Sequence, residues 1–255
     1  MDPGFDDKEH PEFWKSINRI LPELCELSRR LLRCLAAALG TEKVITKNIS
    51  FFLRLRVLSD VPPPICTICL NPGLEEDYFV HRHKYMCTST DNNPTTFRTL
   101  FYPSLSSADT QEPGVQRCGE HSDYGTITLL LQDSIGGLEV LSEGQWIPAT
   151  PIPDTVLVNL GDLMQFWTAD HYKATVSSYE MAPITFTMLI SLFIKMHRVQ
   201  IPKEETRQRC SRQSLAFFVH PDNEVMVSPL DGSTKYPTIS ALDHLNQRYS
   251  QTYTY

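Results

Sequence analysis

A histidine and an aspartate, both residue types that bind metal ions, stand two positions apart in HSDYG, the sequence from His121 to Gly125. In a β-strand, residues i and i+2 point to the same face, so the imidazole and the carboxylate could bind one metal ion from one side. A lone His-x-Asp pair is weak evidence, because hydrogen-bonded pairs of this kind are common in purely structural roles. Further ligands elsewhere in the chain are needed before the pair indicates a site.

Several motifs follow the pair in order: LLQDSIGGLEV, LVNLGDLMQFWTADHYKATV, HRV at His197 to Val199, and RQSLAFFVHP. Their order, spacing and flanking residues resemble the non-haem Fe(II), 2-oxoglutarate-dependent oxygenases of the isopenicillin-N-synthase-like branch. The resemblance covers residues 94–229 well, and ELCELSRRLLRCLAAALG also looks like the long helix of that family. It implies a mainly β fold with flanking helices (α+β), with a double-stranded β-helix, or jelly roll, at its core and a long N-terminal helix.

The resemblance also implies a set of metal ligands. His121, Asp123 and His197 match the triad of two histidines and one carboxylate that holds Fe(II) on one face of the ion. Such a triad leaves positions open for 2-oxoglutarate, the cosubstrate, and for molecular oxygen. His171, in ADHYKATV, is a second candidate for the third ligand, although it precedes the position that the family uses.

A binding site for 2-oxoglutarate follows from the same resemblance. Arg212 and Ser214 match the Arg-x-Ser motif of the family, in which the guanidinium grips the distal carboxylate of 2-oxoglutarate and the hydroxyl adds a hydrogen bond. Tyr102 matches a tyrosine that often bonds to the same molecule. The sequence departs from the family at Leu100, where many members carry an asparagine, and this departure makes the role of Tyr102 harder to predict.

The activity implied by these residues is that of an Fe(II)- and 2-oxoglutarate-dependent dioxygenase. It would hydroxylate, desaturate or cyclise a small molecule while 2-oxoglutarate is decarboxylated to succinate. An oxidase of the isopenicillin-N-synthase type, which uses no keto acid, is an alternative within the enzyme class, and Arg212 and Ser214 argue against it. A catalytically impaired splice or gene-model variant, with a non-enzymatic role or none, is the alternative outside it.

Two segments interrupt the resemblance, at about 41–73 and 177–196. Without them the chain would read LRCLAAALG followed by LEEDYFVHRHKYM, and YKATV followed by HRVQIPKEE, and both joins look like uninterrupted family sequence. We interpret the segments as in-frame additions from alternative splicing, retained introns or a gene-model error, and the short N-terminus as a truncation. Because closure entropy grows only with the logarithm of loop length, His197 could still return to the site.

The elements that must position these residues fall into two regions, predicted at 1–93 and 94–255. In the first, apolar residues recur at helical spacing, and Pro22 predicts a break near Leu21, followed by a long helix that ends at Gly40. In the second, short runs of β-branched and aromatic residues separated by turn signals predict strands. These runs are TITLLLQD, GGLEVLSEGQWIPAT, TVLVNLGD, QFWT and SLAFFVHP.

Composition narrows the class of partner. The net charge of -7 argues against a nucleic-acid surface, and the basic residues Arg29, Arg30 and Arg33 are interpreted as a solvated helix face. The most apolar stretch, ITFTMLISLFI, is too short to cross a bilayer. The acidic N-terminus carries no secretory signal and the 7 cysteines are scattered, so we expect reduced thiols, a cytoplasmic location and a small-molecule substrate.

Two other patterns are weaker. Cys66 and Cys69, followed by His81 and His83, have the cysteine spacing of a zinc site, but His-x-His is tighter than the histidine spacing of a zinc finger. LVNLGDL contains a single glycine and so lacks a phosphate-binding cradle. We interpret it as a strand followed by a turn, with Asn159 and Asp162 as turn formers.

Overall fold

A computed structural model of the 255-residue chain describes residues 10–39, 74–88, 90–105, 115–142, 144–170, 196–202 and 209–252. The first interrupting segment lies outside the described residues, as do all but the last residue of the second, and also His171, Cys66 and Cys69. The origin of both segments and the truncation therefore stay predictions. None of the described helices is long and apolar enough to span a membrane.

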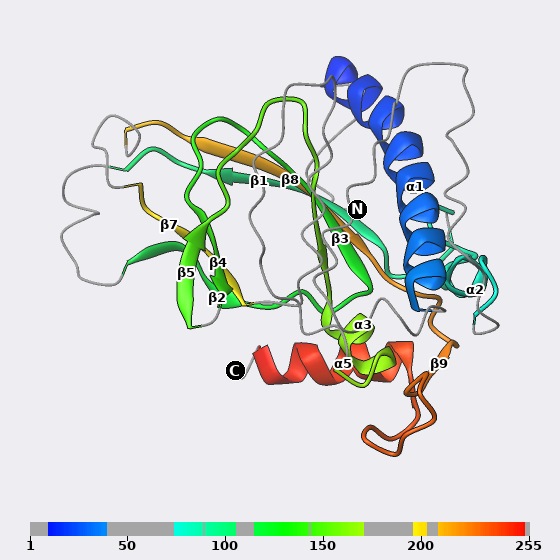
Figure 1. Cartoon of the computed structure of the whole chain (residues 1–255). Helices are drawn as coiled ribbons and strands as arrows, with labels where there is room; N and C mark the ends of the chain where they lie inside the picture. Colours follow the sequence, from blue (N-terminus) through cyan, green and yellow to red (C-terminus); the bar gives the residue numbers. More distant parts are fainter. Residues whose placement is uncertain are drawn as a thin grey trace.

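Two four-stranded antiparallel sheets form the core of the fold (Figure 1). The first sheet has the order β1 (Thr96–Tyr102), β8 (Arg212–Val219), β3 (Ile127–Gln132) and β6 (Leu157–Leu160). The second has the order β2 (Gln116–His121), β7 (His197–Gln200), β4 (Leu138–Ser142) and β5 (Gln145–Pro148). Except from β4 to β5, successive strands alternate between the sheets, and this alternation makes a jelly roll, as the sequence predicted.

Four helices and a short hairpin accompany the sheets in the described part of the chain. They are α1 (Pro11–Leu39), α2 (Tyr78–His81), α3 (Asp162–Trp167), α5 (Ala241–Thr252) and the pair β9 (Met226–Val227) with β10 (Ile239–Ser240). In Figure 1, α1 runs beside β3 of the first sheet on the right, while the strands of the second sheet lie on the left. An ion pair of 2.6 Å between Arg33 and Asp77 ties α1 to the start of α2, so Arg33 is not simply solvated.

Helix α1 is continuous through Pro22, so the predicted break near Leu21 is wrong. Proline removes one backbone donor and leaves the carbonyl four residues earlier without its partner. Here Pro22 and Asn18 both lie on the exposed side of the helix, where water can satisfy that carbonyl. The buried residues Ile17 and Leu24 lie on opposite sides of the proline in sequence yet share one apolar face, and this face holds the helix together.

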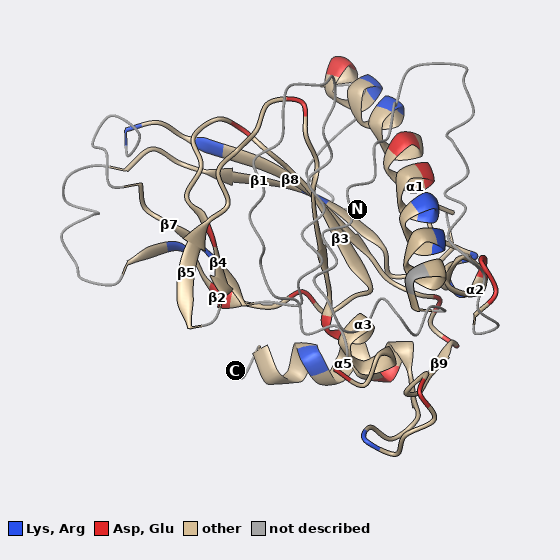
Figure 2. Cartoon of the chain, in the orientation of Figure 1, with Lys and Arg blue, Asp and Glu red and all other residues tan. Residues whose placement is uncertain are grey.

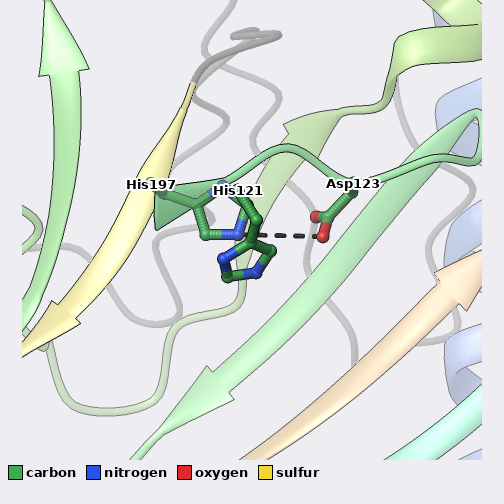
Figure 3. Close-up of side chains that lie close together, drawn as sticks. All are labelled: His121, Asp123 and His197. Atoms are coloured by element: carbon green, nitrogen blue, oxygen red, sulfur yellow. Dashed lines mark ion pairs between the residues drawn. The ribbon is translucent and has the colours of Figure 1, made fainter. Parts of the chain in front are cut away.

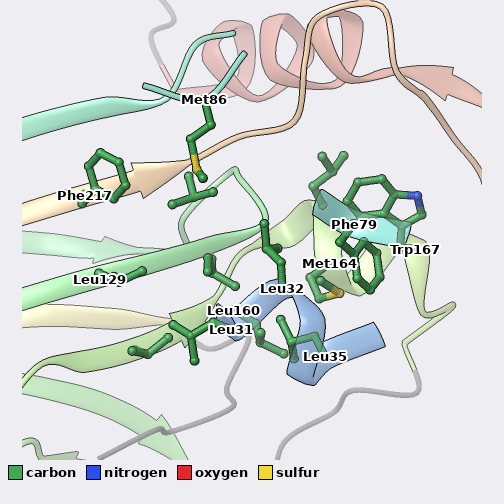
Figure 4. Close-up of a cluster of buried hydrophobic side chains, with 14 of the residues drawn as sticks. Leu31, Leu32, Leu35, Phe79, Met86, Leu129, Leu160, Met164, Trp167 and Phe217 are labelled. Atoms are coloured by element: carbon green, nitrogen blue, oxygen red, sulfur yellow. The ribbon is translucent and has the colours of Figure 1, made fainter. Parts of the chain in front are cut away.

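The hydrophobic core joins α1 to the first sheet and to α3 (Figure 4). Leu32, Phe79 and Trp167 are fully buried, and the rings of Phe79 and Trp167 meet edge to face at a centroid distance of 5.1 Å. Leu129 of β3 packs into the same cluster. The predicted regions 1–93 and 94–255 therefore share one core.

Two further expectations are wrong. QFWT does not form a strand but ends α3, in which Leu163, Met164 and Trp167 are buried at helical spacing. Its aromatic residues favoured a strand, but tertiary packing overrode that local preference.

Reduced thiols were expected throughout, yet a disulfide joins Cys25 of α1 to Cys87, which stand 62 residues apart. Such a sequence separation hides the pairing until the fold is known.

Candidate metal centre

The side chains of His121, Asp123 and His197 converge at one end of the second sheet (Figure 3). His121 ends β2 and stands directly opposite His197, the first residue of β7, so both rings point to the same face at a centroid distance of 4.2 Å. The Nε2 atom of His197 lies 3.7 Å from Oδ1 of Asp123, and the ligand atoms of the three residues lie within 4.8 Å of one another. His197 thus reaches its predicted partners.

The loop that carries Asp123 is held by backbone hydrogen bonds to the end of β6. The N–H of Asp162 donates to the Asp123 carbonyl at 2.8 Å, and the N–H of Gly161 donates to the Thr126 carbonyl at 3.0 Å. Glycine is required at both close approaches: a Cβ atom on Gly161 would collide with the Gly125 carbonyl oxygen, and one on Gly125 with the Val219 carbonyl oxygen. This packing explains the glycine at the end of HSDYG and the glycine of LVNLGDL.

Asn159 is a site residue that sequence reasoning missed. It lies in β6 and its side-chain amide donates to Oδ2 of Asp123 at 2.7 Å, so it is not a turn former. Asp162 begins α3 rather than forming a turn. The sequence feature that could have indicated its role is a polar side chain within the otherwise apolar strand LVNL.

His121 presents one particular ring nitrogen to the site. Its Nδ1 atom lies 2.8 Å from the Gly119 carbonyl, which can only accept, so Nδ1 carries the hydrogen and Nε2 is left to bind a metal. The pKa of His121 is raised to about 9, chiefly by the Cys118 thiol, which lies 3.8 Å from Nδ1. Burial of the ring acts in the opposite direction. Metal binding in the metal-free protein therefore releases a proton from this ring.

Helix α5 braces the same loop from outside. Nη2 of Arg248 lies 2.8 Å from Oδ2 of Asp162 and donates to Oγ of Ser122 at 3.1 Å, while Ser122 donates to Asp162 at 3.0 Å. Burial raises the pKa of Asp162, and the charge of Arg248 partly offsets that effect. Ser122, which precedes Asp123, and Asp162 are thus both connected to α5.

Arg212 lies at the other predicted binding position and is 1% exposed. Its guanidinium donates to the Gly136 carbonyl at 2.9 Å, to Oγ of Ser214 at 3.2 Å and to Oε1 of Gln132 at 3.2 Å. All three acceptors are neutral, and among the described residues no carboxylate pairs with Arg212. A buried charge without a counter-charge is costly, so this position favours an anionic ligand.

Tyr102 lies beside Arg212, as the family resemblance implies. The two residues stand directly opposite each other on β1 and β8, and the guanidinium carbon of Arg212 lies 5.0 Å from the centre of the tyrosine ring. Burial raises the pKa of Tyr102, while the charge of Arg212 lowers it in part. The hydroxyl therefore stays protonated at neutral pH and can donate a hydrogen bond.

The donor set suits a particular metal and ligand. Two imidazoles and one carboxylate on one face, with positions left open, fit Fe(II), and a buried guanidinium beside two hydroxyl groups fits a carboxylate. A zinc site that includes His83 gains no support, because both of its ring nitrogens are engaged, at 2.7 Å from the Phe79 carbonyl and at 2.9 Å from Oγ1 of Thr126.

Comparison with known proteins agrees with this chemistry. The sequence profile of the 2OG-Fe(II) oxygenase superfamily matches residues 93–181. 2-Oxoglutarate-Fe(II) type oxidoreductase hxnY of Emericella nidulans is 33% identical over 197 residues, which cover 74% of this chain and 47% of that protein. Proline hydroxylase buaE of Petromyces alliaceus is 31% identical over 181 residues, which cover 66% of this chain and 50% of that protein.

Solved structures share the fold as well. A full-length Neurospora crassa protein, crystallised in complex with alpha-KG and thymine, superposes with a TM-score of 0.66 at 26% identity, over 94% of this chain and 57% of that chain. The chain spans about half the length of the curated relatives it matches.

Proposed function

We propose that this chain, which belongs to the 2OG-Fe(II) oxygenase superfamily, acts as a dioxygenase that oxidises a small organic molecule while 2-oxoglutarate is converted to succinate. The observation that carries this proposal is the presence of two binding features in one jelly roll. His121, Asp123 and His197 converge within 4.8 Å, and Arg212 is buried without a counter-charge among the described residues.

The residues of this chain have distinct parts in the reaction. His121, Asp123 and His197 would hold Fe(II) through two imidazole nitrogens and one carboxylate oxygen, leaving positions open for 2-oxoglutarate and molecular oxygen. When bound, iron and 2-oxoglutarate together supply the redox chemistry that oxidises the substrate. Asp123 offsets positive charge at the centre and is itself buried, which strengthens that interaction.

Arg212 would bind the distal carboxylate of 2-oxoglutarate and fix which end of the molecule reaches the metal. Its guanidinium is already oriented by Gly136, Ser214 and Gln132, so little side-chain entropy is lost on binding. Ser214 and Tyr102 offer hydroxyl groups beside it. These residues favour a keto-acid-dependent enzyme over an oxidase of the isopenicillin-N-synthase type, and assignment to that branch stays a prediction.

We infer that the substrate is a small molecule rather than a nucleic acid. The Neurospora crassa protein was crystallised with thymine, a free base, and this chain has a net charge of -7. In Figure 2, acidic and basic residues are interspersed along α1. Such a distribution does not favour binding to a phosphate backbone.

The impaired-variant alternative is not favoured. If the interruptions had disabled the site, we would expect the third ligand to be displaced from the other two. His197 nevertheless stands opposite His121, although residues 171–195 and 203–208, which flank β7, lie outside the described part of the chain.

Turnover of 2-oxoglutarate tests the proposal. Purified protein supplied with Fe(II), oxygen and 2-oxoglutarate should form succinate slowly even without substrate, because oxidation of the cosubstrate can run uncoupled. His197→Ala should abolish succinate formation, and Arg212→Gln should raise the KM for 2-oxoglutarate on the order of 100-fold, as expected for the loss of charge-assisted hydrogen bonds. If both variants formed succinate as the unaltered protein does, with the same rate and the same KM for 2-oxoglutarate, the proposal would be refuted.

A further inference from the structure

Asp123 has two carboxylate oxygens, and the structure gives them different surroundings. Oδ1 lies 3.7 Å from Nε2 of His197 and so faces the position where a metal would bind. Oδ2 accepts a hydrogen bond of 2.7 Å from the side-chain amide of Asn159. The carboxylate is almost fully buried, at 7% exposure, so water has little access to either oxygen.

The position of Asn159 is fixed by the first sheet and not by the metal-binding strands. It stands opposite Thr128 in the β3–β6 pairing, between Val158 and Leu160, which are both buried. The same end of β6 also holds the backbone of the Asp123 loop, through the bond from the Asp162 N–H to the Asp123 carbonyl. The backbone of Asn159 is therefore held by contacts that do not involve the metal ligands' side chains, and its amide is directed at Asp123.

A hydrogen bond to one of its two oxygens affects how a carboxylate binds a metal ion. A carboxylate with two free oxygens can bind a metal through one or both, whereas an oxygen already accepting a strong hydrogen bond from a fixed amide is less available. Binding through Oδ1 alone leaves one more position open on the ion. The reaction proposed above would use such open positions for 2-oxoglutarate and molecular oxygen.

We propose that Asn159 is a positioning residue that holds Asp123 as a ligand through one oxygen, with Oδ1 on the metal and Oδ2 on the amide. This inference rests on the proposed function, because it assumes that His121, Asp123 and His197 bind a divalent metal. Removing the amide should weaken metal binding about 10- to 100-fold, the usual effect of losing a group that orients a ligand. It should also change the coordination of the metal that still binds.

The test uses Asn159→Leu, which keeps the size of the side chain but removes the donor, with Asn159→Ala as a second variant in case leucine prevents folding. Co(II), an air-stable substitute for Fe(II), is titrated into each metal-free protein, and its visible absorption is recorded. We expect a dissociation constant about 10- to 100-fold higher than that of the unaltered protein. We also expect a changed Co(II) spectrum, which a merely structural role would not produce.

Asn93→Leu is the matched control. The Asn93 amide donates to Oδ1 of Asp222 at 2.8 Å, an asparagine–aspartate bond of similar length that does not touch the metal ligands. It should lower thermal stability to a similar extent as Asn159→Leu while the Co(II) affinity and spectrum stay unchanged.

Three outcomes would overturn the inference: unchanged Co(II) affinity in the Asn159 variants, weakened affinity with an unchanged Co(II) spectrum, or equal losses of affinity in Asn93→Leu and Asn159→Leu. If the unaltered protein bound no Co(II), the proposed function would fail first. The two failures are therefore distinguishable.

Discussion

At the scale of single residues, Gly161 determines where the metal-binding loop lies. A side chain at this position would meet the Gly125 carbonyl oxygen, and the loop that contains Gly125 also carries Asp123. The collision involves backbone on both sides, so no flexible side chain can move to relieve it. The loop itself must shift, and Asp123 must shift with it.

We therefore predict that Gly161→Ala weakens metal binding and lowers the free energy of unfolding by about 1–3 kcal/mol, the usual cost of overpacking. Co(II) titration and urea unfolding measure the two effects. Gly119→Ala is the control, because a Cβ atom on Gly119 has no heavy atom within 4 Å, and it should change stability by less than about 0.5 kcal/mol. Tight metal binding by Gly161→Ala would contradict this account of the loop.

Individual residues differed in how far the sequence could predict them. The triad, Arg212, Ser214 and Tyr102 were named from motifs that lie close together in the sequence or match a family pattern. Asn159 and Arg248 were not, because their roles depend on contacts with Asp123 and Asp162 that only the fold creates. An asparagine after two apolar residues, or an arginine in a helix, carries no such information by itself.

At the scale of elements, β7 depends on its neighbours for its position. It has 4 residues and carries His197, and the described segment around it covers only residues 196–202. The side chain of Arg198 joins it to the rest of its sheet. The guanidinium lies 3.1 Å from Glu120 of β2 and 2.9 Å from Glu139 of β4, and its central carbon lies 4.0 Å from the centre of the Trp146 ring on β5.

Arg198→Met, which retains most of the aliphatic stem, should therefore loosen β7 and weaken metal binding at least several-fold, because His197 is the preceding residue. The Arg198 side chain is 17% exposed, so its ion pairs are screened less than those on the open surface. Co(II) titration measures the effect, and Arg29→Met, which removes a partly exposed arginine on α1, should leave the affinity unchanged. Equal affinities in all three proteins would show that backbone pairing alone positions His197.

Elements were predicted well where a periodic pattern of apolar residues extended over many residues or where a strand was apolar. They were predicted poorly elsewhere. The segment QFWT was too short for its period to distinguish a helical turn from a strand. The break expected at Pro22 did not occur, because the packed face of α1 outweighs one lost hydrogen bond. Both errors arise from the same cause, namely that tertiary packing overrides local preference.

At the scale of the whole molecule, three buried histidines make stability depend on pH. Burial is the main cause that lowers the pKa of His83, His220 and His244 to about 4. Each is neutral in the folded state near neutral pH, while the unfolded chain takes up protons as the pH falls below about 6.5. Stability is therefore lost as the pH falls from 6.5 towards 4.

Urea unfolding of the metal-free protein at pH 7 and pH 5 should show this loss, on the order of several kcal/mol in total. His121 opposes this loss only weakly, because its raised pKa of about 9 places most of its own contribution above pH 6.5. His244→Gln should reduce the difference between the two pH values. A free energy of unfolding that is equal at both, or higher at pH 5, would contradict the burial of neutral imidazoles.

The disulfide acts at the same scale, since it ties α1 to the segment after α2 across 62 residues. Closing a loop of that length restricts the unfolded chain and stabilises the fold by up to about 4 kcal/mol. Dithiothreitol should lower the melting temperature of the unaltered protein but not that of Cys87→Ala. A melting temperature that does not respond to reductant would show that the thiols are reduced, as expected for the cytoplasmic location, which stays a prediction.

The overall class, a jelly roll with a long first helix, was predicted from ordered motifs over much of the chain. Neither the shared core nor the Cys25–Cys87 pair was, because both join residues that are far apart in the sequence. Another long-range contact, the pairing of β2 with β7, brings His197 opposite His121, although residues 171–195 between them lie outside the described part of the chain. We therefore propose that this chain assembles a single site for Fe(II) and 2-oxoglutarate.

The most direct test is an anaerobic titration of the purified chain with Fe(II) and 2-oxoglutarate, followed by the weak visible charge-transfer absorption of a keto acid chelated to ferrous iron. We predict that this absorption appears for the unaltered protein, disappears for Asp123→Ala, and requires far more 2-oxoglutarate for Arg212→Gln. If a folded protein gives no such absorption, or if Asp123→Ala gives the same absorption, the three side chains do not form an iron site and the account is wrong.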